Sequence, residues 1–337
     1  MNKPQIAAVR ELLAQNPVVT APMAGLTDLA FREILREQGA GLIYTEMISD
    51  MALCYNNQKT LDMLPVAEEQ GPLVVQLCGS SPEHMARAAL IIEQRLAADG
   101  EGRLFMLDIN MGCPAPKIVK NGEGCRLMQQ PDLAVQLVQA VVGAVGDKLP
   151  VSVKMRLGWD DSSKNVLDLA ARLVQAGASA LAIHGRTREQ FYAGRADWQL
   201  IAEAAATLPV PIIGNGDIDS VQMGVERRQS SGCAGLMIGR GLLGNPWLAR
   251  DLARHFAGLP ALPPPGRVEI FQMVRRHLRR QAELQGEYMG VRVMRSHLPF
   301  YIKGLPGAAA MRGRLNGLNT VTEVEAALAE FLLPGGE

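Results

Sequence analysis

The sequence predicts an alternating α/β barrel of the TIM type, followed by a small helical domain. Eight short runs of apolar and β-branched residues recur with helix-like stretches between most of them. Several of these stretches end in the glycine expected just past a helix. A proline-rich linker, residues 258–266, then precedes two further helical patterns.

The eight candidate strands follow one another along residues 1–257, which form the expected barrel. They are residues 17–23, 41–47, 73–79, 104–110, 151–157, 180–186, 210–216 and 234–240. A doubly wound open sheet is the alternative. It is disfavoured because no GxGxxG motif follows the first strand.

Residues 267–337 predict a separate helical domain with an uneven charge. The whole chain carries 34 basic and 34 acidic residues, yet residues 267–315 contain ten lysines and arginines and only three acids. A local excess of this kind predicts an anionic partner, whereas a merely solvated helix face is the alternative. The candidate phosphate-binding side chains are Arg275, Arg276, Arg279, Arg280, Arg292 and Arg295.

Composition excludes several other classes of protein. No apolar run approaches the roughly 18 residues of a membrane span, and the N-terminus has no apolar signal core. Five widely spaced cysteines match neither a disulfide framework nor paired zinc ligands. We therefore expect a reduced, cytoplasmic protein without a bound metal.

Alternation within the strands predicts a polar barrel mouth. In VSVKMRL, the apolar residues face one way, whereas Lys154 and Arg156 face the other. The apolar set belongs against the helices, so both cations should point into the barrel near its carboxyl end. The same pattern turns inward Gln76, Asp108, Asn110 and His184. Active sites of TIM barrels lie at this end.

Glycine-rich loops follow the seventh and eighth strands, in the motifs IIGNGDI and MIGRGLLGNP. Loops at these positions often bind phosphate through backbone N–H groups, and Arg240 could add a fixed charge. Ordinary tight turns are the alternative. Lys154 could form a Schiff base, hold a cofactor ring or extend its amine to solvent. His184 could orient a ring or fill the core.

Cys113 lies between Gly112 and Pro114, directly after the fourth strand. A thiol in this turn would stand at the barrel mouth as a nucleophile or a general acid. No base is adjacent to it in sequence, and a thiol of ordinary pKa, about 8.5, stays protonated at neutral pH. This favours a proton donor, with a buried turn cysteine as the alternative.

Seven motifs in order, together with the C-terminal GVRVMRSHLPFYIKGLPGA, resemble the tRNA-dihydrouridine synthases, most closely their bacterial B-type branch. The motifs are APMAGLTD, QLCGS, DINMGCPAPKIVKNGEG, VKMRLGW, IHGRT, GNGDI and IGRG. The resemblance implies an FMN-binding catalytic barrel over residues 1–257 and a tRNA-binding domain over residues 267–337. It also implies NADPH as reductant and reduction of the C5–C6 double bond of tRNA uridines, in the D-loop region.

The resemblance further implies roles for particular residues. Cys113 would be the catalytic acid, Asn110 would help to place the base, and Arg156 would contact the substrate. The residues that would bind FMN are Pro22, Met23, Ala24, Gln76, Lys154, His184, Asn215, Gly216, Asp217, Gly239 and Arg240.

Three other functions remain open at this point. A flavin barrel acting on free pyrimidines or dihydroorotate would share the barrel and the mouth cysteine, but would not need the basic helical domain. A Schiff-base aldolase built on Lys154 would be colourless when purified. A non-catalytic RNA-binding protein would explain the basic helical domain but not the polar barrel mouth.

Overall fold

The computed structural model of the protein describes residues 3–97 and 104–333. The ends of both predicted domains, at residues 1 and 337, therefore extend outside the described residues. Eight parallel strands form one sheet in the order β1-β8-β7-β6-β5-β4-β3-β2. They are β1 (Val18–Thr20), β2 (Ile43–Ser49), β3 (Leu73–Cys78), β4 (Leu104–Met111), β5 (Val151–Met155), β6 (Ala180–His184), β7 (Ile212–Asn215) and β8 (Gly235–Ile238).

The two edge strands of this sheet approach each other and nearly close a barrel. The amide of Thr20 in β1 donates to the carbonyl of Leu42, 2.9 Å away, and Val19 bridges Leu42 in parallel. This arrangement confirms the predicted TIM barrel and excludes the doubly wound sheet. It also brings the carboxyl ends of all eight strands to one mouth.

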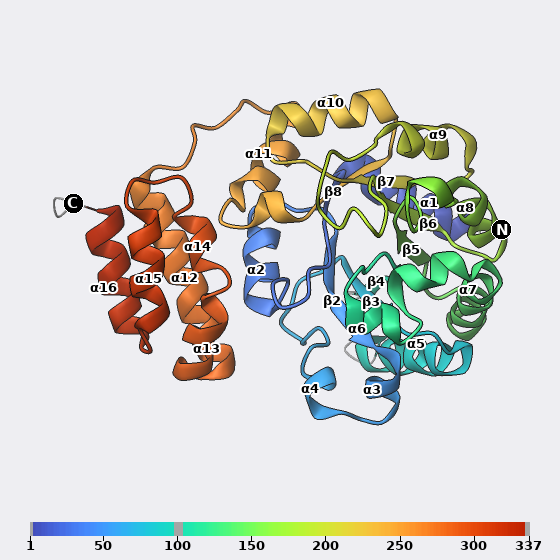
Figure 1. The fold of residues 1–337 in the computed structure, drawn as a ribbon, viewed down its shortest axis with the longest axis horizontal. Helices are drawn as coiled ribbons and strands as arrows, with labels where there is room; N and C mark the ends of the chain where they lie inside the picture. Colours follow the sequence, from blue (N-terminus) through green and yellow to red (C-terminus); the bar gives the residue numbers. More distant parts are fainter. Residues whose placement is uncertain (1–2, 98–103, 334–337) are drawn as a thin grey trace.

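Helices surround the sheet, as Figure 1 shows. The longer ones around the barrel are α2 (Leu29–Glu37), α5 (Pro82–Ala97), α7 (Pro131–Val145), α8 (Val166–Gln175), α9 (Gln199–Thr207), α10 (Val221–Ser231) and α11 (Trp247–Phe256). Short helical turns occupy the loops: α3 (Asp50–Cys54), α4 (Gln58–Leu61), α6 (Pro116–Lys120), η1 (Gly124–Gln129), η2 (Asp161–Ser163) and η3 (Arg240–Leu242). Local chemistry marks several helix starts, such as the Asp28 carboxylate that caps α2 through the amide of Phe31.

The predicted alternation within the strands is confirmed in β5. Val151, Val153 and Met155 are buried in the cluster that joins the strands to the outer helices. Ser152, between them, points into the barrel, where its hydroxyl donates to Asp108.

Helix α1 (Lys3–Gln15), to which the sequence assigned no role, packs against the barrel interior. Its Val9 and Leu13 are fully buried in one cluster with interior residues such as Met106 and Ile213. Apolar packing therefore fills the part of the barrel below the polar mouth.

The predicted C-terminal helical domain is present, with a hydrophobic core of its own that includes Val274, Leu278 and Val324. Its helices are α12 (Arg267–Gln285), α13 (Glu287–Met294), α14 (Leu298–Tyr301), α15 (Ala308–Gly317) and α16 (Val321–Leu332). They stand beside α2 at one side of the barrel (Figure 1).

Aromatic and ionic contacts join this domain to α2. The ring of Phe31 stacks on His277, with centroids 5.5 Å apart, and Arg280 binds Glu33 through two hydrogen bonds of 2.8 Å. Arg276 binds Glu37 in the same way. Two of the arginines proposed to bind phosphate therefore help to dock the domain on the barrel.

Candidate active site

A cavity of about 1190 Å³ opens at the mouth of the barrel, where the strands end. The structure brings together there every residue that the sequence assigned to catalysis or to the cofactor. The cavity is lined by Pro22, Met23, Ala24, Gln76, Asn110, Cys113, Lys154, His184, Asn215, Gly216, Asp217, Gly239 and Arg240, and also by Arg156.

A chain of hydrogen bonds forms the floor of this cavity. The amide of Asn110 donates to Gln76 Oε1 (2.8 Å), and the amide of Gln76 donates to Asp108 (2.7 Å). Ser152 donates to the other oxygen of Asp108 at 2.6 Å. Burial raises the pKa of Asp108 to about 6, although these donors and Lys154 oppose the rise. Because each polar group in the chain has a partner, the floor is a fixed surface.

The turn that carries Cys113 is held by Asn110 and by a close backbone approach. Asn110 Oδ1 accepts hydrogen bonds from the amides of Gly112 (3.1 Å) and Cys113 (2.9 Å). Gly124, at φ +59°, packs so closely that a Cβ there would lie 2.7 Å from the Cys113 carbonyl oxygen. Asn110 thus fixes the position of the thiol, and its own carbonyl oxygen is already engaged.

The surroundings of Cys113 keep its thiol protonated. Burial raises the pKa of Cys113, while the amide of Ala115 and the nearby cations of Lys154 and Arg156 lower it by less. The side chain is half-buried and lines the cavity, whereas the other four cysteines are buried. A protonated, accessible thiol suits a proton donor better than a nucleophile.

Two further titratable groups face the cavity in unusual states. Burial lowers the pKa of Lys154 to about 8; the charge of Arg156 adds to this, whereas Asp108 opposes it. Burial and the neighbouring cations hold the pKa of His184 well below its ordinary value. His184 is therefore neutral at pH 7 and acts there as a hydrogen-bonding group without charge.

Arg156, which the sequence assigned to the substrate, is 2% exposed and has three backbone partners. It donates to the carbonyls of Gly112 (3.0 Å), Thr187 (2.8 Å) and Phe191 (2.7 Å). This guanidinium therefore ties the turn of Cys113 to the loop after β6. We call residues 187–196 the lip loop.

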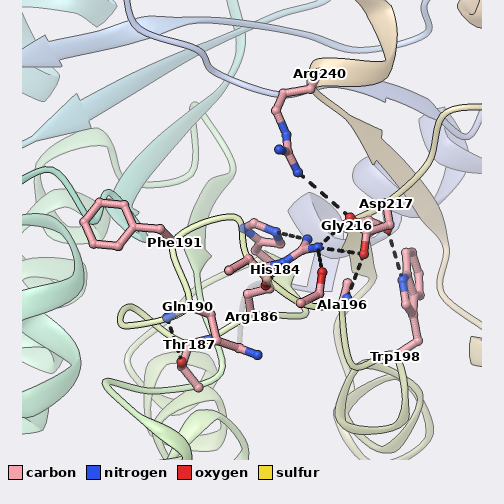
Figure 2. A network of polar contacts seen from close by, with 12 residues as sticks. His184, Arg186, Thr187, Gln190, Phe191, Ala196, Trp198, Gly216, Asp217 and Arg240 are labelled. Atoms are coloured by element: carbon pink, nitrogen blue, oxygen red, sulfur yellow. Dashed lines mark hydrogen bonds and ion pairs between the residues drawn. The ribbon is translucent and has the colours of Figure 1, made fainter.

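The glycine loop after β7 has a strained backbone that an ion pair supports. Gly216 has φ +133°, and Asp217 has φ +49°, a left-handed conformation that is rare for a residue with a side chain. Burial raises the pKa of Asp217, but hydrogen bonds from the Ala196 amide and Arg186 outweigh that effect and hold it below its ordinary value. Figure 2 shows Arg186 and Arg240 on either side of this carboxylate.

Sequence reasoning missed Arg186 and two aromatic residues of the lip loop. Arg186 is inward by the same alternation that turned His184 inward, so the pattern could have found it. Phe191 and Tyr192 line the cavity with 37% and 53% of their surfaces exposed. Aromatic residues in a loop give no periodic signal, so the sequence did not mark them.

The six tail arginines do not line the cavity, and most already have protein partners. Besides the two that bind α2, Arg279 binds Glu325, Arg292 donates to Tyr288, and Arg295 donates to Leu318 and Asn319. Arg275 lies over the ring of Phe271. That these arginines bind RNA stays a prediction.

Residues of the helical domain also line the cavity, namely Ile270, Phe300, Tyr301, Lys303 and Leu305.

Over residues 3–97 and 104–333, no cluster of three or more histidine, cysteine, aspartate or glutamate side chains could hold a metal ion. None of the helices in the described part of the chain is long and apolar enough to cross a membrane.

The family model for dihydrouridine synthases (Dus) matches residues 19–333. The chain belongs to the dihydrouridine synthase family. The "Probable tRNA-dihydrouridine synthase" of Rickettsia conorii is 37% identical over 315 residues, which cover 93% of this chain and 92% of the relative. The "tRNA-dihydrouridine synthase B" of Pseudomonas syringae pv. tomato is 37% identical over 321 residues, which cover 95% of this chain and 92% of the relative. The resemblance expected from the motifs is thus confirmed.

A solved structure of histamine dehydrogenase from Rhizobium sp. 4-9 shares the fold of this chain. The TM-score is 0.50 at 12% identity, over 78% of this chain and 49% of that one.

We predict that iodoacetamide alkylates Cys113 before the other cysteines, and slowly at pH 7. Because burial raises the pKa of this thiol, the thiolate fraction should grow about tenfold per pH unit from pH 7 towards the pKa. Mass spectrometry of tryptic peptides over this pH range measures the rate at each cysteine. A fast rate at pH 7 that no longer rises with pH would mean that Cys113 is already a thiolate.

Proposed function

We propose that this protein reduces the C5–C6 double bond of specific uridines in tRNA, giving dihydrouridine, with FMN as its cofactor and NADPH as its reductant. One observation carries the proposal: glycine loops, Lys154 and a protonated Cys113 line one cavity in a chain of this family. The match over both the barrel and the helical domain favours tRNA over free pyrimidines, since relatives named as tRNA-dihydrouridine synthases are covered almost entirely.

The cavity fits a planar, phosphorylated cofactor. Its volume of about 1190 Å³ exceeds the roughly 300–1,000 Å³ of ordinary ligand sites, which leaves room for a base beside the cofactor. A Cβ at Gly239 would lie at contact distance from Ala21 Cβ (3.4 Å) and Met23 Sδ (3.5 Å), which both line the cavity, so any side chain at this position would stand among the lining residues. Arg240 is half exposed and offers its charge to an anion.

On this proposal, Asn215, Gly216, Gly239 and Arg240 hold the phosphate of FMN. Gln76, Lys154 and His184 contact its ring or ribityl chain, and Pro22, Met23 and Ala24 line the flavin. The carboxylate of Asp217 would repel a phosphate, and it is bound to Arg186. We therefore assign Asp217 to the support of this loop.

Gln76, Lys154 and His184 would hold FMN at this mouth, where the reduced cofactor would supply the hydride for C6 of the uridine, with NADPH as its reductant. Cys113 holds the matching proton on Sγ and delivers it to C5. Its raised pKa keeps that proton in place until the base arrives. Asn110 holds the turn, and Arg156 holds the turn to the lip loop, so the thiol has a fixed position over the floor.

A uridine in folded tRNA has to leave its stack to reach this cavity. The exposed rings of Phe191 and Tyr192 at the mouth are surfaces on which bases can stack. Lys117 and Lys120 on α6, just after Cys113, and Lys303 at the cavity are exposed cations that can meet the RNA backbone.

We predict that Cys113→Ala separates the two half-reactions. NADPH should still reduce FMN, since that step needs no thiol, while dihydrouridine formation should fall about 10² to 10⁴-fold. Rapid mixing of each half-reaction measures both rates. Cys125→Ala, in the same segment, is the control, and Cys113→Ser should restore little. Reoxidation of Cys113→Ala by uridine-bearing tRNA at the wild-type rate would show that another group is the acid.

We predict that the triple change Lys117→Ala, Lys120→Ala and Lys303→Ala weakens tRNA binding and flattens its salt dependence. Each lost phosphate contact should lower the slope of log K against log salt by about 0.7 to 0.9. Lys148→Ala is the control, because Lys148 pairs with Glu93 just before β5, at the opposite end of the barrel from the mouth. Binding measured over a range of salt concentrations decides the matter. An unchanged slope in the triple variant would exclude these three lysines and leave the predicted tail arginines as the RNA surface.

A further inference from the structure

The lip loop has no helix or strand, and arginine side chains hold its backbone. Arg186, just before the loop, donates from Nε to the carbonyl of Ala193 (3.0 Å) and from Nη2 to that of Gly194 (2.7 Å). Within the loop Phe191 has φ +48°, a conformation that a bulky residue keeps only where its surroundings impose it. The shape of the loop therefore depends on these donors.

The same guanidinium binds the glycine loop after β7. Arg186 Nη2 lies 2.7 and 2.8 Å from the two carboxylate oxygens of Asp217. The carboxylate also accepts from the amide of Ala196 at 2.7 Å, so it contacts the far end of the lip loop as well. Arg186 is only 2% exposed, so water cannot accept hydrogen bonds from its guanidinium and the protein must supply the acceptors.

Arg240, from the loop after β8, completes the network seen in Figure 2. Its guanidinium lies 3.9 Å from Asp217 Oδ1 and 4.5 Å from the centre of the Tyr192 ring. About half of its side chain is exposed, so it can also meet an anion. The loops after β6, β7 and β8 therefore meet at Arg186, Asp217 and Arg240.

We infer that Arg186 is a positioning residue that couples occupancy of the phosphate site to the conformation of the lip loop. An anion bound at Arg240 and the glycine loop after β7 orders that loop, which Asp217 supports. Because Arg186 binds both Asp217 and the carbonyls of Ala193 and Gly194, the lip loop around Tyr192 becomes ordered as well. By linkage, order in the lip loop strengthens anion binding by the same factor. The inference rests on the proposed function, because the anion is the phosphate of FMN.

Coupling of this kind sets the order of events at the mouth. The cofactor must be bound before the lip loop takes the shape that receives a base. If the ion pair only stabilised the fold, FMN binding would not change the conformation of the lip loop.

Limited trypsin digestion tests the coupling directly, because Arg188 and Arg195 both lie in the lip loop. FMN should slow cleavage at these two sites about tenfold in the wild type. Arg186→Gln, studied at an FMN concentration that saturates it, should lose this protection, and Arg186→Lys should keep part of it. Arg172→Gln, an arginine paired on the barrel exterior, is the matched control and should behave as the wild type.

A double-mutant cycle on FMN affinity gives the reciprocal test. Tyr192 is exposed, so Tyr192→Ala should fold, and it should weaken FMN binding about 5- to 100-fold, as measured by flavin fluorescence. In the Arg186→Gln background the same change should have almost no further effect.

The outcomes separate the inference from the proposed function. A wild-type protein that binds no FMN overturns both. A wild type that binds FMN, yet is cut at the same rate with and without it, overturns the coupling alone. So does a cycle in which the effects of Tyr192→Ala and Arg186→Gln simply add.

Discussion

Two buried guanidinium groups under the mouth of the barrel determine how the loops around them are arranged. Arg156 and Arg186 are each 2% exposed, and an arginine cannot lose its charge by shedding a proton. Their donors must therefore find acceptors inside the protein. The acceptors are loop carbonyls and the carboxylate of Asp217, so satisfying both cations fixes the turn of Cys113, the lip loop and the glycine loop together.

Burial at the same mouth sets the protonation states on which the proposed chemistry depends. Burial keeps the proton on Cys113, and burial together with neighbouring cations keeps it off His184. Lys154, with a pKa of about 8, remains mostly charged at neutral pH. The mouth thus offers a proton donor, a neutral ring and a cation side by side, and burial makes the protonated thiol and the neutral ring more firmly favoured than they would be in water.

Much of this arrangement could be predicted from the sequence, because strand alternation is a local signal. It correctly turned Gln76, Asp108, Lys154 and His184 inward and placed Cys113 at the mouth. Ion pairs between residues far apart in the sequence leave no such local signal. Arg276 and Arg280 looked like free phosphate ligands, but their partners Glu37 and Glu33 lie 239 and 247 residues away. The lip loop likewise owes its shape to Arg156 and Arg186, which no local pattern of the loop reveals.

Whether this mouth holds FMN is decided by the visible absorption spectrum of the purified protein. We expect a flavin spectrum, and a chromophore released on denaturation that has the mass of FMN. A protein that is colourless, and stays so after incubation with FMN and removal of the excess, would show that the mouth does not hold FMN. Lys154 would then have to be examined as a Schiff-base residue.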